Sequence, residues 1–457
     1  MKYNSWYFIS ILAFIFTQVL ADDVITCNST QPCPLDNPCC SQFGICGTGA
    51  YCLGGCDIRY SYNISACMPM PKMESFTHAF DSKAVVEEIE QQYEYLGNYS
   101  EADWVYSGWI DYHDNALLVQ MPANSTGTVL SSTKYAWYGR IGATLKTSHD
   151  VGVVTAFITF SDVQDEIDYE FVGYDTKTPQ TNFYAQGILN YTNARNSTVN
   201  DTFLYYHLYE MDWTEEKIDW IIDGNVVRTL NRADTWNETT KRYDYPQTPS
   251  RLQISLWPGG DPSNGLGTIE WAGGEISWDT PDIKNYGYYF AYIKEFHLEA
   301  YDPPSDAQFD GNSTNPSDYH AYIYKSISGN EQDVAFTNKK TWLGSSDAVG
   351  FNPQNENDPS PSAKSSSEVK TSTIIKTSGS STITAVTTIA EAPTANAPAQ
   401  NQAQAAQQTQ GIGYEPSMGF RQNAANTASS AGEAAGVQGV LSGVVGAIGL
   451  GVISFLI

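Results

Sequence analysis

Acidic and apolar side chains alternate along Asp165-Glu166-Ile167-Asp168-Tyr169-Glu170-Phe171. A period of two is typical of a β-strand, whose successive side chains face opposite ways. One face then carries Glu166, Asp168 and Glu170, and the other carries three large apolar side chains. Three carboxylates in one row repel one another, so their presence indicates a functional role. A solvated outer face and a calcium site are the structural alternatives.

The spacing of the two glutamates suits the cleavage of a glycosidic bond. Residues four apart on a strand have Cα atoms roughly 13 Å apart. Two Glu side chains that lean toward each other bring their carboxyls to about 5–6 Å, as in a retaining glycosidase. One Glu then attacks the anomeric carbon, and the other protonates the leaving oxygen. The central Asp can hydrogen-bond the nucleophile, and its like charge keeps the pKa of the acid high.

Residues 75–300, which surround this segment, alternate apolar and polar positions. Examples are Gly152–Phe160 and Arg251–Trp257, and turn signals such as Asp223-Gly224-Asn225 separate such stretches. Many short strands with Gly, Pro and Asn turns predict an all-β sandwich or jelly roll. A weak amphipathic helix is expected at Ser82–Tyr95, and nothing indicates alternating βαβ units.

The acidic segment resembles the catalytic strand of family-16 glycoside hydrolases, which are retaining enzymes with a β-jelly-roll fold. The wider region, about residues 75–300, is similar to the fungal Crh-type cell-wall transglycosylases. The resemblance implies that Glu166 is the nucleophile, Asp168 the assisting carboxylate and Glu170 the acid/base. The wider resemblance rests on ordered motifs: Tyr138-Gly139-Arg140-Ile141, Asp212-Trp213, Asp223-Gly224, Ser255-Leu256-Trp257-Pro258-Gly259-Gly260 and Gly267-Thr268-Ile269-Glu270-Trp271-Ala272-Gly273-Gly274.

A second strand, Arg251–Trp257, places hydrogen-bonding groups and a large ring on one face by alternation. Such a face suits a pyranose, which has an apolar side and equatorial hydroxyls. The resemblance implies that Gln253, Trp257 and Thr268 line the sugar cleft together with Glu170. Gln253 stands where the family often has a basic residue. The alternative for Trp257 is core packing. Other tryptophans are expected in the core or, at most, in the cleft walls: Trp213, Trp220 and Trp271.

All the cysteines lie in a module of residues 22–68, which is too short to build a core and is expected to depend on disulfides. The segment Cys39–Gly47, followed by Tyr51-Cys52, resembles the hevein-like (family-18) chitin-binding module. The resemblance implies that Ser41, Phe43 and Tyr51 bind sugar, whereas Ile45 replaces a usual aromatic residue. A structural spacer is the alternative. The implied disulfides are Cys27–Cys40, Cys33–Cys46, Cys39–Cys52 and Cys56–Cys67.

The N-terminal residues 1–21 are expected to form a secretory signal peptide, with one basic residue, an apolar stretch and small residues before the cleavage point. Beyond the β-rich region, residues 301–343 form an extension. Residues 344–426 form a Ser/Thr-rich stalk, whose composition cannot bury enough apolar area to fold.

Residues 427–457 are expected to be a GPI-attachment propeptide, because small residues and a polar spacer precede an apolar end. Asn426 is the expected attachment site, with Asn423 and Ser430 as rivals. An ordinary transmembrane helix is the alternative, although no basic flank follows the apolar tail.

The charge balance excludes some partners. With 51 acidic and 24 basic residues the net charge is −27, which disfavours nucleic acid and an anionic membrane surface but not a neutral polysaccharide. The histidines are scattered, and no phosphate loop or dinucleotide fingerprint is present. No redox or nucleotide cofactor and no metal site are expected, although calcium on a jelly roll stays open.

These features together predict a secreted enzyme, GPI-anchored at the plasma membrane and cell wall. The resemblance implies that it cleaves chitin and transfers the fragment to β-1,3- or β-1,6-glucan. A hydrolytic endo-β-glucanase or chitinase of the same fold is one alternative. A non-catalytic chitin-binding wall protein is another.

Overall fold

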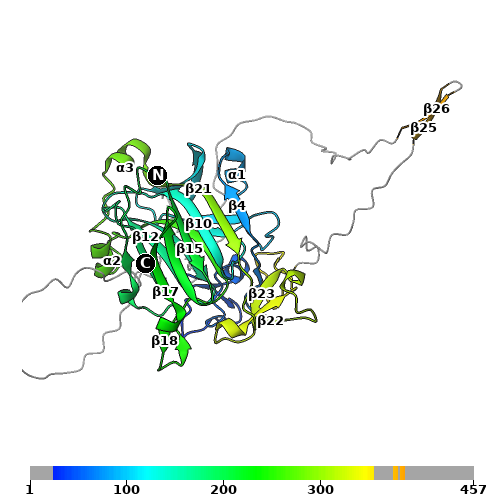
Figure 1. Cartoon of the computed structure of the whole chain (residues 1–457), viewed down its shortest axis with the longest axis horizontal. Coiled ribbons are helices and arrows are strands. Elements are labelled where there is room, and N and C mark those ends of the chain that lie inside the picture. The colour runs from blue at the N-terminus through cyan, green and yellow to red at the C-terminus, as the bar shows by residue number, and fades with distance from the viewer. Residues whose placement is uncertain (1–23, 355–373, 379–380, 386–457) are drawn as a thin grey trace, which may run out of the picture.

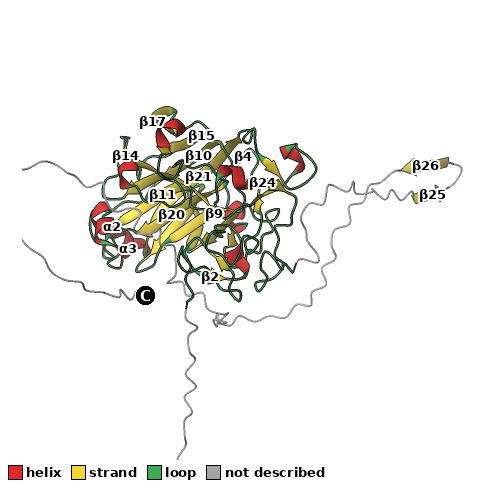
Figure 2. Cartoon of the chain, turned by 90° about the horizontal axis from the view of Figure 1, so that it is seen from below, coloured by secondary structure: helices red, strands yellow, loops and turns green. Residues whose placement is uncertain are grey.

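The computed structural model describes residues 24–354, 374–378 and 381–385. Two eight-stranded sheets lie face to face and form a β-jelly-roll sandwich, preceded by a small disulfide-rich module (Figures 1 and 2). The predicted all-β class is therefore confirmed. The signal peptide, most of the stalk, Asn426 and the C-terminal tail lie outside the described residues. Among those described, no helix has the length and apolarity needed to cross a membrane.

The first sheet is antiparallel throughout and contains the long strand that is central in Figure 1. In spatial order its strands are β17 (Asn225–Asn231), β16 (Lys217–Ile222), β15 (His207–Trp213), β10 (Gly139–Lys146), β21 (Tyr288–Ala300), β8 (Ala116–Pro122) and β7 (Trp109–His113), with β4 (Phe76–Ala79) also paired to β21.

The second sheet is antiparallel except at one edge, where its last two strands pair in parallel. Its strands are β14 (Arg195–Asn196), β13 (Gln180–Tyr184), β12 (Glu166–Val172), β11 (Val153–Ser161), β20 (Ser250–Pro258), β9 (Thr128–Ser132), β6 (Trp104–Ser107) and β5 (Glu90–Gln91).

Smaller elements surround the sandwich. The helices are α1 (Lys83–Glu87), α2 (Leu266–Trp271) and α3 (Pro281–Tyr286). A four-stranded sheet contains β22 (Gln308–Phe309), β24 (Val334–Thr337), β23 (Ala321–Tyr324) and β3 (Met70–Pro71). The two-stranded pairs are β1 (Cys39–Cys40) with β2 (Cys46–Gly47), β18 (Trp236–Asn237) with β19 (Arg242–Tyr243), and β25 (Ile374–Ser378) with β26 (Ser381–Ala385).

The alternation in the acidic segment sets its two faces as predicted. Ile167, Tyr169 and Phe171 enter the main hydrophobic core between the sheets. Their partners there include Trp213 and Trp220, which are fully buried. The core fixes the register of β12, because a shift by one residue would turn the carboxylates into the hydrophobic core in place of these three apolar side chains.

The turn between β16 and β17 shows how local sequence sets this topology. Asp223 and Gly224 have φ values of 49° and 78°, and they connect the paired residues Ile222 and Asn225. Two positive φ values in a two-residue loop are typical of a type I′ hairpin, for which Asp-Gly is a favoured sequence.

The predicted helix at Ser82–Tyr95 is wrong in extent. The helix α1 ends at Glu87, and the chain then runs into β5, which pairs with β6. Val86 and Ile89 are buried in the main core. Tertiary pairing of this segment therefore overrides its weak helical pattern.

Four disulfides hold the N-terminal module. They are Cys27–Cys40, Cys33–Cys46, Cys39–Cys52 and Cys56–Cys67, the pairs that the hevein-like resemblance implies. The sulfurs of Cys27, Cys33 and Cys40 lie within 4.8 Å of one another, but each belongs to a disulfide and is no free metal ligand.

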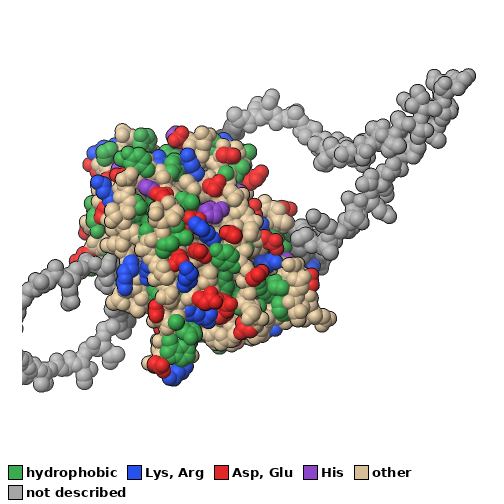
Figure 3. Space-filling model, viewed as in Figure 1, with side chains coloured by type: hydrophobic (Ala, Val, Ile, Leu, Met, Phe, Trp, Pro, Cys, Tyr) green, Lys and Arg blue, Asp and Glu red, His purple; other side chains and the backbone are tan. Residues whose placement is uncertain are grey.

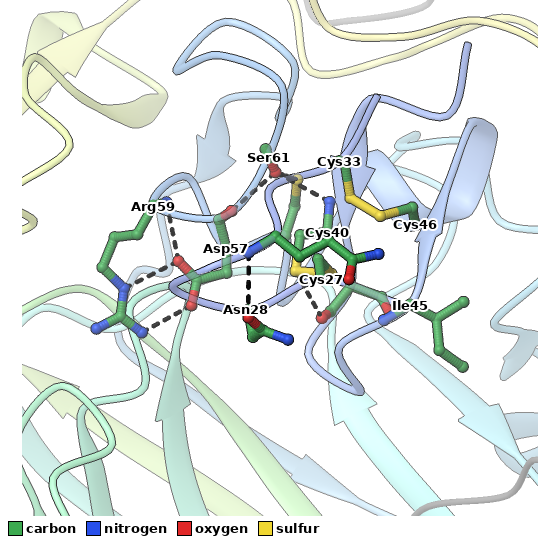
Figure 4. The surroundings of a disulfide bond; sticks show 12 residues. Cys27, Asn28, Cys33, Cys40, Ile45, Cys46, Asp57, Arg59 and Ser61 are labelled. Atoms are coloured by element: carbon green, nitrogen blue, oxygen red, sulfur yellow. Dashed lines mark hydrogen bonds and ion pairs between the residues drawn. A yellow bond between two sulfur atoms is a disulfide. The ribbon is translucent and has the colours of Figure 1, made fainter. Parts of the chain in front are cut away.

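The module packs directly against the jelly roll and is not joined to it by a linker alone. Gly55 N donates to Asp162 Oδ1 at 2.9 Å, and Arg59 Nη1 donates to the carbonyl oxygen of Gln186 at 3.1 Å. An ion pair with Asp57, at 2.7 Å, orients the Arg59 guanidinium (Figure 4). These polar contacts fix the module on segments that directly follow β11 and β13 of the second sheet.

Candidate active site

The three predicted catalytic carboxylates project from β12, near the middle of the second sheet. Across β11, Glu166 lies opposite Phe160, Asp168 opposite Ile158, and Glu170 opposite Ala156. Their side chains face away from the core that holds Tyr169. The structure therefore brings Glu166, Asp168 and Glu170 into one row on one face of the sheet.

Burial makes Glu170 suited to hold a proton. Its side chain is 5% exposed, and burial, followed by the negative charge of Glu166, raises the pKa of Glu170 to about 8. A carboxyl with such a pKa is protonated at neutral pH and can act as a general acid. This matches the role that the family resemblance implies for Glu170.

Asp168 differs from the sequence-based interpretation in one respect. It is fully buried, and burial, then the charges of Glu166 and Glu170, raises its pKa well above the usual range. The sequence-based interpretation has the charge of Asp168 raise the pKa of Glu170. The like charge that does so belongs to Glu166. A neutral Asp168 can instead donate a hydrogen bond to the Glu166 carboxylate.

The backbone of β12 is tied to the first sheet by two side chains. The Tyr169 hydroxyl lies 3.1 Å from the carbonyl oxygen of Glu210 and 3.0 Å from that of Ile221. Trp220 Nε1 donates to the carbonyl oxygen of Asp168 at 3.0 Å. The sequence predicts Trp220 as a core residue, and the structure adds this positioning contact.

A polar row that sequence reasoning missed lies beside the carboxylates on β13. Tyr184 is opposite Glu166, Asn182 opposite Asp168, and Gln180 opposite Glu170. Asn182 Nδ2 donates to the Tyr184 hydroxyl at 2.7 Å. The signal was present, because Gln180, Asn182 and Tyr184 alternate along their strand just as the carboxylates do.

On the other side of β11, the strand β20 carries the predicted sugar-binding residues. Gln253 lies opposite Ile158, and Trp257 lies opposite Val154. Because directly paired residues share a face, Gln253 and Asp168 are in one row across the three strands. Gln253 and Trp257 are almost fully buried.

The helix α2 completes this side of the site. Thr268 is fully buried on it, and the Trp271 ring stacks on that of Trp257 with centroids 6.1 Å apart. Trp271 Nε1 donates to Gln180 Oε1 at 2.9 Å, which joins the α2 side to β13. Trp271 is thus a wall residue, as the sequence allowed.

Several polar atoms on this face are buried without a hydrogen-bond partner in the described part of the chain. They are both carboxyl oxygens of Asp168, Glu170 Oε1, Ser255 Oγ and Trp257 Nε1. Orphaned buried polar groups are uncommon in folded proteins. A ligand with many hydroxyl groups would satisfy them.

The three predicted sugar-binding residues of the module have different surroundings. Phe43 packs against the cluster that contains Trp257 and Trp271, whereas Tyr51 packs against a second cluster. Ser41 Oγ accepts a hydrogen bond from the backbone N–H of Ile45 at 3.3 Å. Phe43 thus reaches the apolar cluster at the site.

The visible outer face over β10, β15 and β21 mixes acidic and basic side chains (Figure 3). No broad basic patch gathers on the part of that face that the structure describes. Arg140 there is paired with Glu210 at 2.7 Å.

The family model for glycosyl hydrolases family 16 matches residues 98–273. The chain is 62% identical to the Crh-like protein UTR2 of Candida albicans, over 98% of each chain. It is 49% identical to Congo red hypersensitive protein 2 of Saccharomyces cerevisiae, over 77% of this chain and 73% of that one. Among solved structures, the apo Crh5 transglycosylase is 28% identical and has a TM-score of 0.49, with 62% of this chain and 100% of that one covered.

Proposed function

Because the chain belongs to the fungal Crh-type family of glycosyl hydrolase family 16, and is thus a glycosidase/transglycosylase, we propose that it cleaves chitin and transfers the fragment to β-1,3- or β-1,6-glucan. The observation that carries the proposal is the buried row of Glu166, Asp168 and Glu170 beside the polar and aromatic face of β20. The product of such a transfer is a cross-link between two wall polysaccharides.

The first step forms a glycosyl-enzyme intermediate. A Glu166 oxygen attacks the anomeric carbon, and the bond from that carbon to the bridging oxygen breaks. Glu170 gives its proton to the departing oxygen, which leaves as a hydroxyl on the reducing-end portion. Asp168, whose pKa is raised by burial, can donate a hydrogen bond to Glu166 and orient it when it holds a proton.

The second step resolves the intermediate. Glu170, now ionised, takes the proton from a hydroxyl of the acceptor glucan as that oxygen attacks the anomeric carbon. The bond from the anomeric carbon to Glu166 breaks, and the carboxylate is restored. Two inversions give net retention of configuration. If water is the acceptor, the same steps give hydrolysis.

A transfer assay tests this proposal. The secreted protein is incubated with chitin oligosaccharides and a fluorescent glucan oligosaccharide, and the products are separated by size. We expect fluorescence on longer products and none with the Glu166→Gln variant, which has no nucleophile. Gln31→Glu, an exposed change in the module, is the control. Shorter sugars without longer fluorescent products would show a hydrolase instead.

No cleavage of any β-glucan or chitin oligosaccharide, with chitin binding intact, would favour the non-catalytic wall protein. Because Glu166→Gln is a nearly isosteric change, its melting temperature reports whether a loss of activity reflects chemistry rather than folding. A variant that melts as the wild type does, yet is inactive, supports the assignment of the nucleophile.

The proposal extends to the location of the enzyme. The apolar N-terminal stretch, the Ser/Thr-rich stalk and the C-terminal apolar tail support secretion and GPI attachment at Asn426, at the plasma membrane and cell wall. Treatment of cells with a phosphatidylinositol-specific phospholipase should release the enzyme, and Asn426→Gln should prevent anchoring. Anchoring that persists in this variant but is lost with Asn423→Gln or Ser430→Gln would move the site.

A further inference from the structure

The loop Ser41–Ile45 of the module touches the strand that carries the predicted sugar-binding residues. Gln42 Oε1 accepts hydrogen bonds from Arg251 Nη2 at 2.7 Å and from Gln253 Nε2 at 3.0 Å. The neighbouring Phe43 packs against the apolar cluster that contains Trp257. Two consecutive residues of the module therefore meet β20 on the face of the carboxylates.

The register of the second sheet places this contact relative to the chemistry. Gln253 is in the row of Asp168, two strands away, which is about 10 Å at the usual strand spacing. Phe43 shares its cluster with Val172, which follows Glu170 by two residues on β12. The loop therefore borders the carboxylates from the β20 side and does not lie on β12 itself.

The hydrogen bonds fix how the Gln42 amide is turned. Arg251 can only donate, so the atom that faces it must be the Gln42 oxygen. Gln253 then presents its own N–H group to the same oxygen. Within the described residues, no hydrogen bond involves Gln42 Nε2, which leaves that donor for a ligand.

The module is held as a permanent part of this wall. Its residues Cys52, Leu53 and Cys56 share a buried cluster with Tyr95 and Leu343 from the rest of the chain. The module cannot swing away as a body without exposing this cluster and the buried contact from Gly55 N to Asp162. A fixed wall fits these contacts better than a removable lid.

Resting on the proposed function, we propose that Gln42 and Phe43 form one wall of the sugar-binding cleft and bind an N-acetylhexosamine unit of the chitin chain beyond the reacting sugar. Gln42 Nε2 donates to an N-acetyl carbonyl or a hydroxyl oxygen, and the Phe43 ring contacts the apolar side of the sugar. The module then contributes directly to selection among polysaccharides, instead of only tethering the enzyme to chitin.

The sharpest test is Gln42→Glu in the full secreted chain. Glutamate keeps an oxygen for Arg251 and Gln253 but has no amide N–H to donate. We expect the KM for long chitin oligosaccharides to rise about threefold to tenfold, as for the loss of a hydrogen bond. The KM for the shortest cleaved oligosaccharide should stay at the wild-type value, and the melting temperature should not fall, because the new carboxylate pairs with Arg251. Gln31→Glu, which makes the same charge change on an exposed module residue, is the control.

Phe43→Ala tests the ring, with Phe43→Trp as the conservative rescue and Leu35→Ala at an exposed position as the control. Wild-type transfer in the same assay reports on the proposed function separately. If neither Gln42→Glu nor Phe43→Ala raises the KM for long oligosaccharides more than the KM for the shortest one, the inference is wrong, while the proposed function stays intact. A gain in kcat/KM would also overturn it, because the loop would then be blocking the cleft.

Discussion

At the residue scale, the proton on Glu170 sets the pH dependence of activity. Its pKa is raised to about 8 by burial and by Glu166, so the acid is available below that pH and lost above it. We expect kcat/KM on a chitin oligosaccharide to fall about tenfold per pH unit above roughly pH 8. An alkaline limb that starts near pH 5 would contradict this assignment.

The same raised pKa has a consequence for stability. In the unfolded chain Glu170 ionises near its ordinary pKa of 4.5, whereas the folded protein keeps the proton to about 8. The free energy of unfolding therefore decreases as pH rises through this window. Glu170→Gln removes the dependence, so the inactive variant should gain stability over the wild type between pH 5 and pH 8. Denaturant unfolding at both pH values measures the difference.

Gly55 supports the cleft wall because it has no side chain. It adopts φ +82°, and an added Cβ would lie 2.6 Å from Gln42 Oε1. Gly55→Ala should lower the free energy of unfolding by about 1–2 kcal/mol, because alanine is unfavourable in the left-handed backbone conformation. It should also displace Gln42. Gly224→Ala, at φ +78° with open space around it, is the matched control.

Both glycine variants should therefore lower the melting temperature, but only Gly55→Ala should raise the KM for long chitin oligosaccharides. If the two variants have the same KM for long chitin oligosaccharides, the Gly55 turn does not support the cleft wall. Melting curves and the oligosaccharide series already described supply both readouts.

The row of carboxylates could be predicted from sequence because alternation and a motif coincide there. Glu166, Asp168 and Glu170 satisfy both conditions. Gln180 and Tyr184 alternate on β13, but no motif marks them, and their place beside the carboxylates depends on the pairing of β12 with β13. The raised pKa of Asp168 could not be predicted, because its first cause is burial, which the sequence does not show.

At the element scale, Tyr169 ties β12 to the opposite sheet. Its hydroxyl lies 3.1 Å and 3.0 Å from the carbonyl oxygens of Glu210 and Ile221. Tyr169→Phe keeps the ring but leaves buried groups unpaired, so we expect a loss of about 1–3 kcal/mol in the free energy of unfolding. Because β12 carries the catalytic row, kcat should fall more than KM rises.

Tyr209 offers the matched control for this prediction. It is also fully buried in the core, but in the described part of the chain its hydroxyl has no hydrogen-bond partner. Tyr209→Phe should therefore be neutral or stabilising in the same unfolding measurement. Equal losses in the two variants would show that the Tyr169 hydroxyl does not hold β12.

Strands were easier to predict than the short helix. The expected strand Arg251–Trp257 lies within β20, and Gly152–Phe160 differs from β11 by one residue at each end. Both strands are almost entirely buried, so their local patterns agree with the tertiary structure. The helix expected to reach Tyr95 ends at Glu87, since pairing with β6 and burial of Ile89 decide the conformation beyond it.

At the scale of the whole molecule, composition separates the cysteine module from the jelly roll, but packing joins them. The sequence boundary at residue 68 is followed at once by β3, which pairs with β23 of the C-terminal extension. No periodicity or cysteine spacing reveals this contact, because it joins segments some 250 residues apart. The extension and the module are thereby held on one body.

A substitution at Leu343 can test whether the module and the jelly roll form one folded unit. It is fully buried in the cluster shared by the module residue Leu53 and by Tyr95, and its backbone N–H donates to the Leu96 carbonyl oxygen at 2.8 Å. Leu343→Ala should lower the free energy of unfolding by about 2–5 kcal/mol. If the module and jelly roll unfold together, the whole chain should melt in one transition at a lower temperature. Leu35→Ala, at an exposed position of the module, should change the melting temperature little.

Two separate transitions, with only that of the module shifted to lower temperature, would show that the module and the jelly roll are independent domains. A module that unfolds alone would also weaken the case for Gln42 and Phe43 as a fixed wall of the cleft, because the loop could then leave β20 without unfolding the sheet.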